Sequence, residues 1–160
     1  MIIGIISDTH DNVRNVIKAV EIFRKERCEM ILHLGDVISP ATLNFFKDLR
    51  NFKFIRGNCD GDIPKMKEIA EKLGMEYLGE SAKMELGGKK FLLVHRYPDV
   101  MPAEELQRYD YILHGHDHKK KNMKIGKARI INPGAHYYMA ENTIAILDTK
   151  DDNVGFIEIR

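Results

Sequence analysis

The sequence contains few cysteines and no long apolar run. Its two cysteines, Cys28 and Cys59, give no disulfide framework, which favours a cytoplasmic protein. The first apolar run, residues 2–6, ends at Ser7 and Asp8. This run is too short for a signal peptide or a membrane span, so we expect no membrane partner.

The sequence also lacks an excess of charge of either sign. Lys and Arg total 25, and Asp and Glu total 24. This balance gives no global electrostatic reason to expect nucleic acid or an acidic membrane as a partner. One local basic cluster consists of Lys119, Lys120, Lys121, Lys124 and Lys127. A solvated hairpin explains this cluster better than a phosphate-binding patch does.

No linker, low-complexity tract or internal repeat is found, and we expect residues 1–160 to form a single domain. In the first half, short apolar strands alternate with segments of helical periodicity. Strands are expected at residues 1–7 and before Asp36 and Arg56, and helices at residues 12–27, from Ser39-Pro40 onward and at residues 63–74. Asp11 or Asn12 is expected to cap the first helix. This order predicts a right-handed parallel sheet.

The second half is expected to be largely antiparallel. Hairpins are expected from residues 82–86 and 89–94, from residues 121–125 and 128–131, and from residues 143–148 and 154–159. Gly87-Gly88 and Gly126-Lys127 form the first two turns. Two mixed sheets packed together, with helices outside, would accommodate both halves of this α/β chain.

Five of the expected strands end in side chains that can bind a metal ion. These side chains are Asp8 and His10, Asp36, Asn58, His95, and His116 with His118. The carboxyl ends of parallel strands meet at one edge of a sheet, so we expect a single metal-loaded site there. Alternation along an extended chain would put both members of each two-apart pair on the same side. Thiolate ligands are nearly absent, which argues against a structural zinc site.

The same motifs also have structural explanations. Asn58 and Asp60 could simply hydrogen-bond within a turn. His33 and His114 lie inside strands, where packing is the simpler role, and Asp117 is expected to orient a neighbouring group. His136 follows Asn132-Pro133-Gly134 on a loop, where it either reaches the substrate or is an ordinary exposed side chain.

The order of these motifs resembles the calcineurin-like metallophosphoesterases. The resemblance runs from Asp8 to His118 and continues to Asn132-Pro133-Gly134. The short length and Cys59 are most similar to the small bacterial and archaeal phosphodiesterase branch. This resemblance implies a four-layer α-β-β-α sandwich of two mixed sheets flanked by helices.

The resemblance also implies a role for each ligand. Asp8, His10 and His118 would hold one divalent ion, Asn58, His95 and His116 would hold a second, and Asp36 would bridge the two. A metal-bridging hydroxide would then attack the phosphate ester in line. Manganese is the ion we expect, and nickel, iron, cobalt or zinc are compatible with oxygen and nitrogen ligands.

Some positions depart from the family pattern. Cys59 replaces a His that assists the leaving group in larger relatives, so unactivated monoesters are expected to be weaker substrates. Arg96 follows His95 where Gly is common, and it could bind a phosphate oxygen; Ala135 replaces a common Ser. The candidate catalytic residues are Asp36, Asn58, Cys59 and Arg96, and the candidate substrate contacts are Asn12, Arg96 and His136.

The function expected from these residues is a two-metal phosphodiesterase that acts on a small phosphodiester. A non-catalytic scaffold of the same fold, like the metallophosphoesterase-like subunit of retromer, is the main alternative. A phosphomonoesterase or a nuclease is a further alternative. The sequence leaves a homo-oligomer open.

Overall fold

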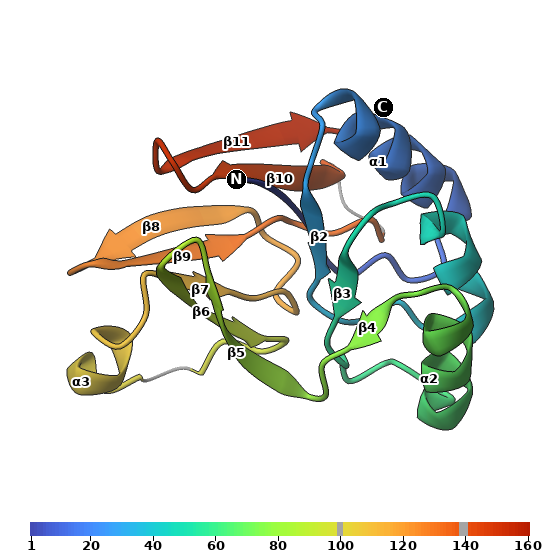
Figure 1. Cartoon of the computed structure of the whole chain (residues 1–160), viewed down its shortest axis with the longest axis horizontal. Coiled ribbons are helices and arrows are strands. Elements are labelled where there is room, and N and C mark those ends of the chain that lie inside the picture. Colours follow the sequence, from blue (N-terminus) through green and yellow to red (C-terminus); the bar gives the residue numbers. More distant parts are fainter. Residues whose placement is uncertain (99–100, 138–140) are drawn as a thin grey trace.

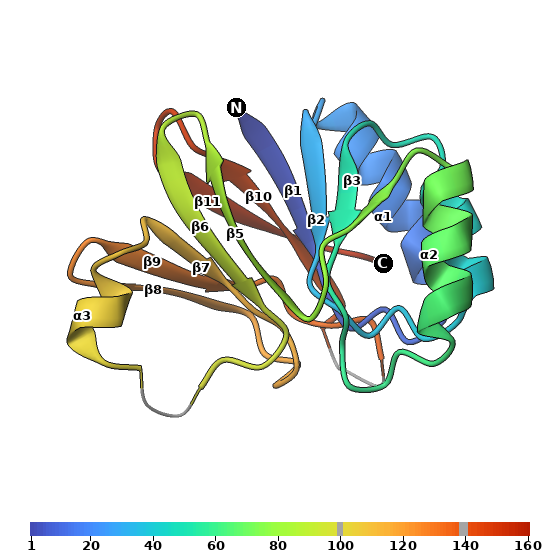
Figure 2. The same ribbon diagram turned by 60° about the horizontal axis from the view of Figure 1, so that its bottom comes forward.

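Two β-sheets pack face to face, with helices on the outside (Figure 1, Figure 2). The structure is a computed structural model that describes residues 1–98, 101–137 and 141–160. In the described residues, no helix combines the length and the apolar character needed to cross a membrane.

The first sheet has the strand order β11-β10-β1-β2-β3-β4. Its strands are β1 (Ile2–Ile6), β2 (Met30–His33), β3 (Phe52–Phe54), β4 (Glu76–Tyr77), β10 (Thr143–Asp148) and β11 (Asn153–Glu158). Strands β1 to β3 run parallel, as the alternating pattern predicted, and β4 adds a parallel strand that was not predicted. Strand β10 joins β1 antiparallel. Apolar residues of β1 and β2 are buried on both faces of the sheet, which explains their continuous apolar runs.

Three helical segments cover the outer face of this sheet. They are α1 (Val13–Lys25), η1 (Pro40–Phe46) and α2 (Ile63–Lys72). The Asn12 side chain accepts a hydrogen bond from the Asn15 N–H and caps α1, as predicted. The helix expected after Ser39-Pro40 is a 3₁₀-helix, in which the Asn44 side chain donates to the Ala41 carbonyl. Such local bonds compete with the α-helical pattern.

The second sheet has the strand order β5-β6-β7-β9-β8. Its strands are β5 (Ser81–Leu86), β6 (Lys89–Val94), β7 (Tyr111–Leu113), β8 (Lys121–Ile125) and β9 (Ala128–Asn132). The predicted hairpins β5–β6 and β8–β9 are both present, and the third, β10–β11, extends the first sheet. The outer layer on this side is the short helix α3 (Ala103–Leu106). The four-layer prediction is therefore confirmed, with a much thinner second helical layer than expected.

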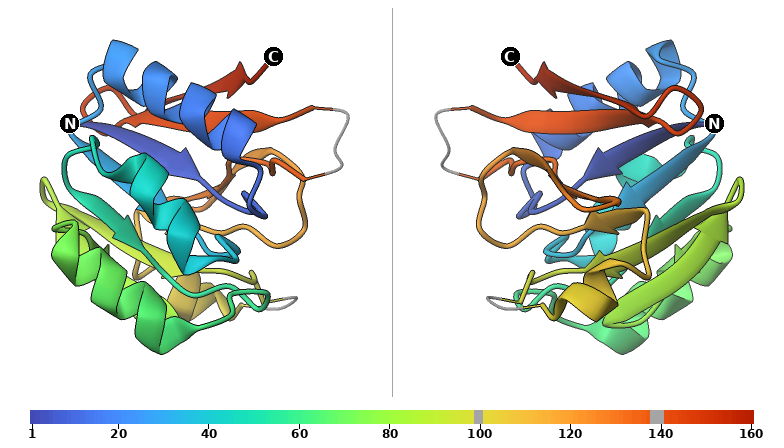
Figure 3. Two further views of the ribbon diagram at one scale, coloured as in Figure 1. Left: turned by 90° about the vertical axis from the view of Figure 1, so that its right-hand side faces the viewer. Right: turned by 90° about the vertical axis from the view of Figure 1, so that its left-hand side faces the viewer.

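Apolar packing fixes the sheets relative to each other. Ile3, Leu32, Phe91, Leu113 and Ile131 are among the buried side chains between the two sheets. A second apolar cluster lies between the first sheet and its helices. The loops that follow β1, β2, β3, β6 and β7 gather at one side of the molecule (Figure 3). Polar residues placed in these loops are therefore brought together.

Candidate metal centre

The residues predicted as metal ligands meet around Asp36. Its Oδ2 atom lies 3.5 Å from His10 Nε2 and 3.5 Å from His95 Nε2. Asp36 follows β2, His10 follows β1 and His95 follows β6, so both sheets contribute to the site. One carboxylate thus stands between two groups of ligands, which is the arrangement expected of a bridging residue.

The first group contains Asp8, His10 and His118, whose candidate ligand atoms all lie within 4.8 Å of one another. His118 Nε2 is 3.3 Å from Asp8 Oδ1, and His10 Nε2 is 4.0 Å from the same oxygen. His10 Nε2 is buried and has no hydrogen-bond partner among the described residues. A cation between these atoms would satisfy that nitrogen, so the group fits a metal ion.

The second group contains Asn58, His95 and His116. Asn58 Oδ1 lies 3.0 Å from His95 Nε2 and 2.9 Å from His116 Nδ1. His95 Nδ1 donates to the Leu34 carbonyl at 2.7 Å, which directs Nε2 at the side-chain oxygens of Asp36 and Asn58. This group therefore also fits a metal ion, with one amide oxygen and two imidazoles as donors.

Most of the predicted ligands have a left-handed backbone conformation. The positive φ angles are 52° at Asp8, 44° at His10, 58° at Asp36, 69° at His116 and 58° at His118. Such φ angles are uncommon outside glycine and cluster at functional sites. The expectation that these pairs lie on extended segments is wrong. Tight turns, and not strand alternation, bring both members of each pair to the site.

The turns are held by hydrogen bonds between loops. The Asp8 N–H donates to the Gly35 carbonyl, and the His10 N–H donates to the Asp36 carbonyl, both at 3.0 Å. The His116 N–H donates to Asp8 Oδ2 at 3.0 Å. These bonds connect the loops after β1, β2 and β7, and they offset the strain of the left-handed residues.

Two glycines allow the loops to approach one another closely. A Cβ atom on Gly57 would lie 2.1 Å from Asp36 Oδ1. A Cβ atom on Gly115 would lie 2.0 Å from Ser7 Oγ and 2.5 Å from Asp8 Oδ2. Neither position has room for a side chain unless a predicted ligand moves.

Asp60 has a positioning role that the sequence reasoning did not assign. Its Oδ2 accepts from the N–H groups of Asp36 at 3.1 Å and Gly57 at 2.6 Å, and its Oδ1 accepts from Ile38 at 2.8 Å. The side chain is buried. The local hydrogen bonding considered for this turn is present, and it fixes the loop that carries Asp36. The signal available in the sequence was the Asp two residues after Asn58.

His33 and His114 are buried, as expected for packed histidines. His33 Nδ1 accepts from the Gly35 N–H, and its Nε2 lies 3.1 Å from Thr9 Oγ1. Burial lowers the pKa of His33 to about 3, so the ring is neutral. His114 Nδ1 donates to the Gly115 carbonyl at 3.0 Å.

His136 corrects one expectation. Its side chain is fully buried, and Nε2 donates to the Thr143 carbonyl at 3.2 Å. The prediction of an exposed loop side chain is therefore wrong, and we do not propose a substrate contact for this ring. The His136 backbone makes two hydrogen bonds near the site. Its N–H donates to the Asp8 carbonyl, and its carbonyl accepts from the Asn12 side chain. Both polar groups of the Asn12 amide are engaged, and its substrate contact stays a prediction.

Asp117 orients Asn132, the first residue of the Asn-Pro-Gly motif. Asn132 Nδ2 donates to Asp117 Oδ1 and, at 3.0 Å, to the Gly115 carbonyl. Asp117 was expected to orient a neighbouring group, and the group is this amide. The motif therefore supports the loop that carries His116 and His118.

The pKa values of the two site carboxylates are shifted in opposite directions. Burial raises the pKa of Asp8. Burial also acts to raise the pKa of Asp36, but hydrogen bonds from His95 and from the Cys59 backbone outweigh it and lower that pKa to about 2. Burial lowers the pKa of His10 against the opposing effect of Asp36. An ionised Asp36 and a neutral His10 are the forms that bind metal ions.

Cys59 and Arg96 lie at the edge of the site. The Cys59 sulfur accepts from Asn58 Nδ2 at 3.0 Å and lies close enough to His10 and Asp36 to join a metal-binding group, which the sequence reasoning did not foresee. Burial, followed by the nearby Asp36, raises the pKa of the Cys59 thiol. Arg96 is exposed and lines two cavities.

These two cavities adjoin the second ligand group and share Arg96 and His116. The first, of about 590 Å³, is also lined by Asn58, Glu80, Ser81, Val94 and His95. The second, of about 440 Å³, is also lined by Tyr97, Pro98, His114, Gly115, Asp117 and Lys121. The two cavities thus leave space for a bound chemical group on each side of Arg96.

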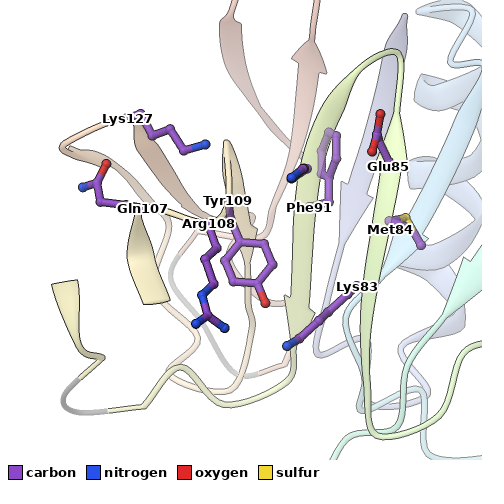
Figure 4. Close-up of a pocket in the computed structure, with 9 residues that line it drawn as sticks. Lys83, Met84, Glu85, Phe91, Gln107, Arg108, Tyr109 and Lys127 are labelled. Atoms are coloured by element: carbon purple, nitrogen blue, oxygen red, sulfur yellow. The ribbon is translucent and has the colours of Figure 1, made fainter. Parts of the chain in front are cut away.

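A third cleft, of about 520 Å³, contains none of the predicted ligands (Figure 4). It lies between β5, β6 and the segment after α3 and is lined by Lys83, Lys90, Arg108 and Lys127 among others. Lys83 and Arg108 lie near Glu105, and Lys127 lies near Asp110. Lys83 and Arg108 share the Glu105 carboxylate, and the cleft is not part of the metal centre.

Comparison with known proteins agrees with this geometry. A family model described as the calcineurin-like phosphoesterase superfamily domain matches residues 1–152. A phosphodiesterase of Methanocaldococcus jannaschii is 33% identical over 156 residues, which cover 94% of each chain. The solved structure of an archaeal phosphodiesterase is 32% identical, with a TM-score of 0.91 over 99% of both chains. A phosphoesterase from E. coli, 18% identical with a TM-score of 0.75 over the whole of both chains, shares the fold. The chain belongs to the calcineurin-like phosphoesterase superfamily.

Proposed function

We propose that the protein is a two-metal phosphodiesterase that hydrolyses a small phosphodiester. The observation that carries this proposal is the position of Asp36 Oδ2, 3.5 Å from one histidine of each ligand group. A carboxylate in that position can bind two ions at once. The named activity of the M. jannaschii relative supports the choice of a diester.

The proposed ligand atoms suit divalent metal ions of intermediate softness. The proposed ligands offer carboxylate and amide oxygens and imidazole nitrogens, which suit manganese, iron, cobalt, nickel or zinc. Manganese is our choice among these ions, by family resemblance. When bound, the two ions would neutralise phosphate charge and lower the pKa of a water molecule.

The chain itself supplies orientation and charge. Asp36 stays ionised at neutral pH because its pKa is lowered to about 2. Asp60 holds the Asp36 backbone, and the exposed Arg96 guanidinium beside His116 can bind two oxygens of a phosphate group in a bidentate manner. Cys59, with its raised thiol pKa, is a poor proton donor to a leaving group. Substrates with good leaving groups should therefore react best.

The geometry favours an enzyme over a scaffold of the same fold. Every predicted ligand position holds a residue that can bind metal, and the hydrogen bonds among loops keep these residues in place. The two cavities beside Arg96 leave space for two ester substituents, whereas a monoester has one. A cytoplasmic location and a homo-oligomeric state stay predictions.

The proposal is tested by comparing substrates under one set of conditions with manganese. We expect bis-p-nitrophenyl phosphate to be hydrolysed with a higher kcat/KM than p-nitrophenyl phosphate. Single-stranded DNA and RNA should be cleaved slowly or not at all. Higher kcat/KM on the monoester would favour a phosphomonoesterase, and rapid cleavage of nucleic acid would favour a nuclease. No hydrolysis of any substrate by the manganese-loaded protein would favour the scaffold.

A further inference from the structure

We infer that the cavity walled by Arg96 and Lys121 beside His116 is a subsite for a negatively charged substituent of the substrate. We call this cavity the anion subsite. The protein would accordingly prefer phosphodiesters that carry a second anionic group. This inference rests on the proposed phosphodiesterase function and adds a substrate class to it.

The anion subsite shares His116 with the candidate metal centre. His116 belongs to the second ligand group and also lines this cavity of about 440 Å³. Arg96 lines both this cavity and the one beside Asn58 and His95. A phosphodiester held at the metal centre would therefore direct one substituent into the anion subsite and the other into the neighbouring cavity.

Lys121 is held in place at the wall of the anion subsite. Its ammonium nitrogen lies 5.9 Å from the centre of the Tyr97 ring and 3.3 Å from Asp117 Oδ2. The cation–π contact and the ion pair both restrict the side chain. An ammonium group has three donors, so Lys121 can bind a further oxygen while it keeps Asp117.

Among the described residues that line the anion subsite, positive charge exceeds negative charge. Arg96 and Lys121 are opposed there by the carboxylate of Asp117, and Asp117 also accepts from Asn132. The neighbouring cavity is different, because it contains the Glu80 carboxylate, which lies 3.4 Å from Arg56. The substituent with the extra negative charge is therefore expected beside Lys121 and away from Glu80.

Lys121 is distinct from the other members of its lysine cluster. Lys120 pairs with Glu141, Lys124 with Asp152 and Lys127 with Asp110. Neither these three lysines nor Lys119 lines the anion subsite. The basic cluster in the sequence is thus mostly a solvated hairpin, as its pattern indicated, with one member placed at the site. Lys124, on the same strand as Lys121, supplies a matched control.

The experiment compares two substrates that differ by one phosphate. Thymidine 5′-(p-nitrophenyl phosphate) and its 3′-phosphorylated form have the same nucleoside and the same leaving group. We expect the manganese-loaded protein to show about a fivefold higher kcat/KM on the phosphorylated form, the scale of a partly exposed ion pair. Lys121→Gln should reduce this ratio to less than about twofold, whereas Lys121→Arg and Lys124→Gln should retain it. Raising the salt concentration should weaken the preference.

Binding gives a second readout that does not depend on turnover. Titration calorimetry should show tighter binding of thymidine 3′,5′-bisphosphate than of thymidine 5′-phosphate, and Lys121→Gln should remove the difference. Equal kcat/KM on the two substrates, or a preference that survives Lys121→Gln, would overturn the anion subsite alone. Hydrolysis of neither substrate would overturn the proposed function, and the inference with it.

Discussion

At the scale of single residues, Asp36 is the residue that connects the two groups of proposed metal ligands. Its carboxylate lies between His10 and His95, and contacts with His95 and the Cys59 backbone keep it ionised. Two dications at a separation of about 3.5–4 Å repel each other strongly unless an anionic ligand lies between them. Binding of two metal ions should therefore depend more on the charge of Asp36 than on the shape of its side chain.

Asp36→Asn tests this point because it preserves the shape and removes the charge. We expect weaker loading of at least one metal ion and the loss of nearly all diesterase activity. Elemental analysis of the purified variant and bis-p-nitrophenyl phosphate hydrolysis are the measurements. His33→Gln, three residues earlier in the same chain segment, should keep its metal and lose only stability. Normal turnover with two bound ions in Asp36→Asn would show that the bridging assignment is wrong.

His33 gives a second test at this scale, through the pH dependence of stability. Its pKa is lowered by burial from 6.5 to about 3, so the unfolded chain takes up a proton at a higher pH than the folded chain does. The stabilisation linked to the neutral ring is complete above about pH 6.5 and is lost as the pH falls from there toward 3. Each pH unit in this window removes about 1.4 kcal/mol of the free energy of unfolding.

We predict that the free energy of unfolding depends less steeply on pH in His33→Gln than in the parent chain. Urea denaturation of metal-free protein between pH 7 and pH 5 should show the free energy of unfolding falling less steeply in His33→Gln than in the parent chain. The variant should also be less stable at pH 7, because the bond to Thr9 and the acceptor for the Gly35 N–H are altered. Parallel pH profiles would show that His33 does not titrate in this way.

At the scale of elements, close packing between the loops after β1 and β7 determines the site. Gly115 lies where any Cβ would meet Ser7 Oγ at 2.0 Å and Asp8 Oδ2 at 2.5 Å. Gly115→Ala should therefore displace Asp8, a predicted ligand, and cost about 1–3 kcal/mol of stability through overpacking. We expect lower metal content together with a lower melting temperature.

The matched control is Gly155→Ala on β11, where an added Cβ would meet nothing within 4 Å. This variant should retain both metal content and melting temperature. Differential scanning calorimetry and elemental analysis of the two variants, prepared in parallel, would separate the loop contact from a general effect of replacing glycine. Equal behaviour of the two variants would argue against the proposed packing of the loops.

The elements also show how far the sequence could predict the structure. Apolar runs that end in Asp8 and Asp36 were sufficient to place these two strand ends at one edge, because β1 and β2 run parallel in one sheet. His95 follows a strand of the second sheet, so its place at the site depends on how the two sheets pack. Gly87-Gly88 was sufficient for the β5–β6 hairpin. Other features depend on contacts distant in sequence. The left-handed turns at Asp8 and His116 are stabilised by bonds to other loops, and the burial of His136 depends on Thr143.

At the scale of the whole molecule, the fold and the site have separate sources of stability. One apolar cluster lies between the sheets, and another lies between the first sheet and its helices. Neither cluster includes a predicted metal ligand. The protein should therefore fold without metal. The site nevertheless contains the fully buried Asp8 carboxyl, whose pKa is raised by burial, and a bound cation would offset the cost of burying its negative charge.

Chelation should consequently abolish activity, retain the secondary structure and lower the melting temperature. The protein is treated with EDTA, desalted and measured by far-ultraviolet circular dichroism, thermal unfolding and bis-p-nitrophenyl phosphate hydrolysis. The dichroism spectrum should be unchanged and hydrolysis absent. Adding manganese should restore hydrolysis and raise the melting temperature in a concentration-dependent manner, because the ion binds the folded state. Loss of the dichroism spectrum would show that the metal is structural, and hydrolysis without metal would contradict the two-metal mechanism.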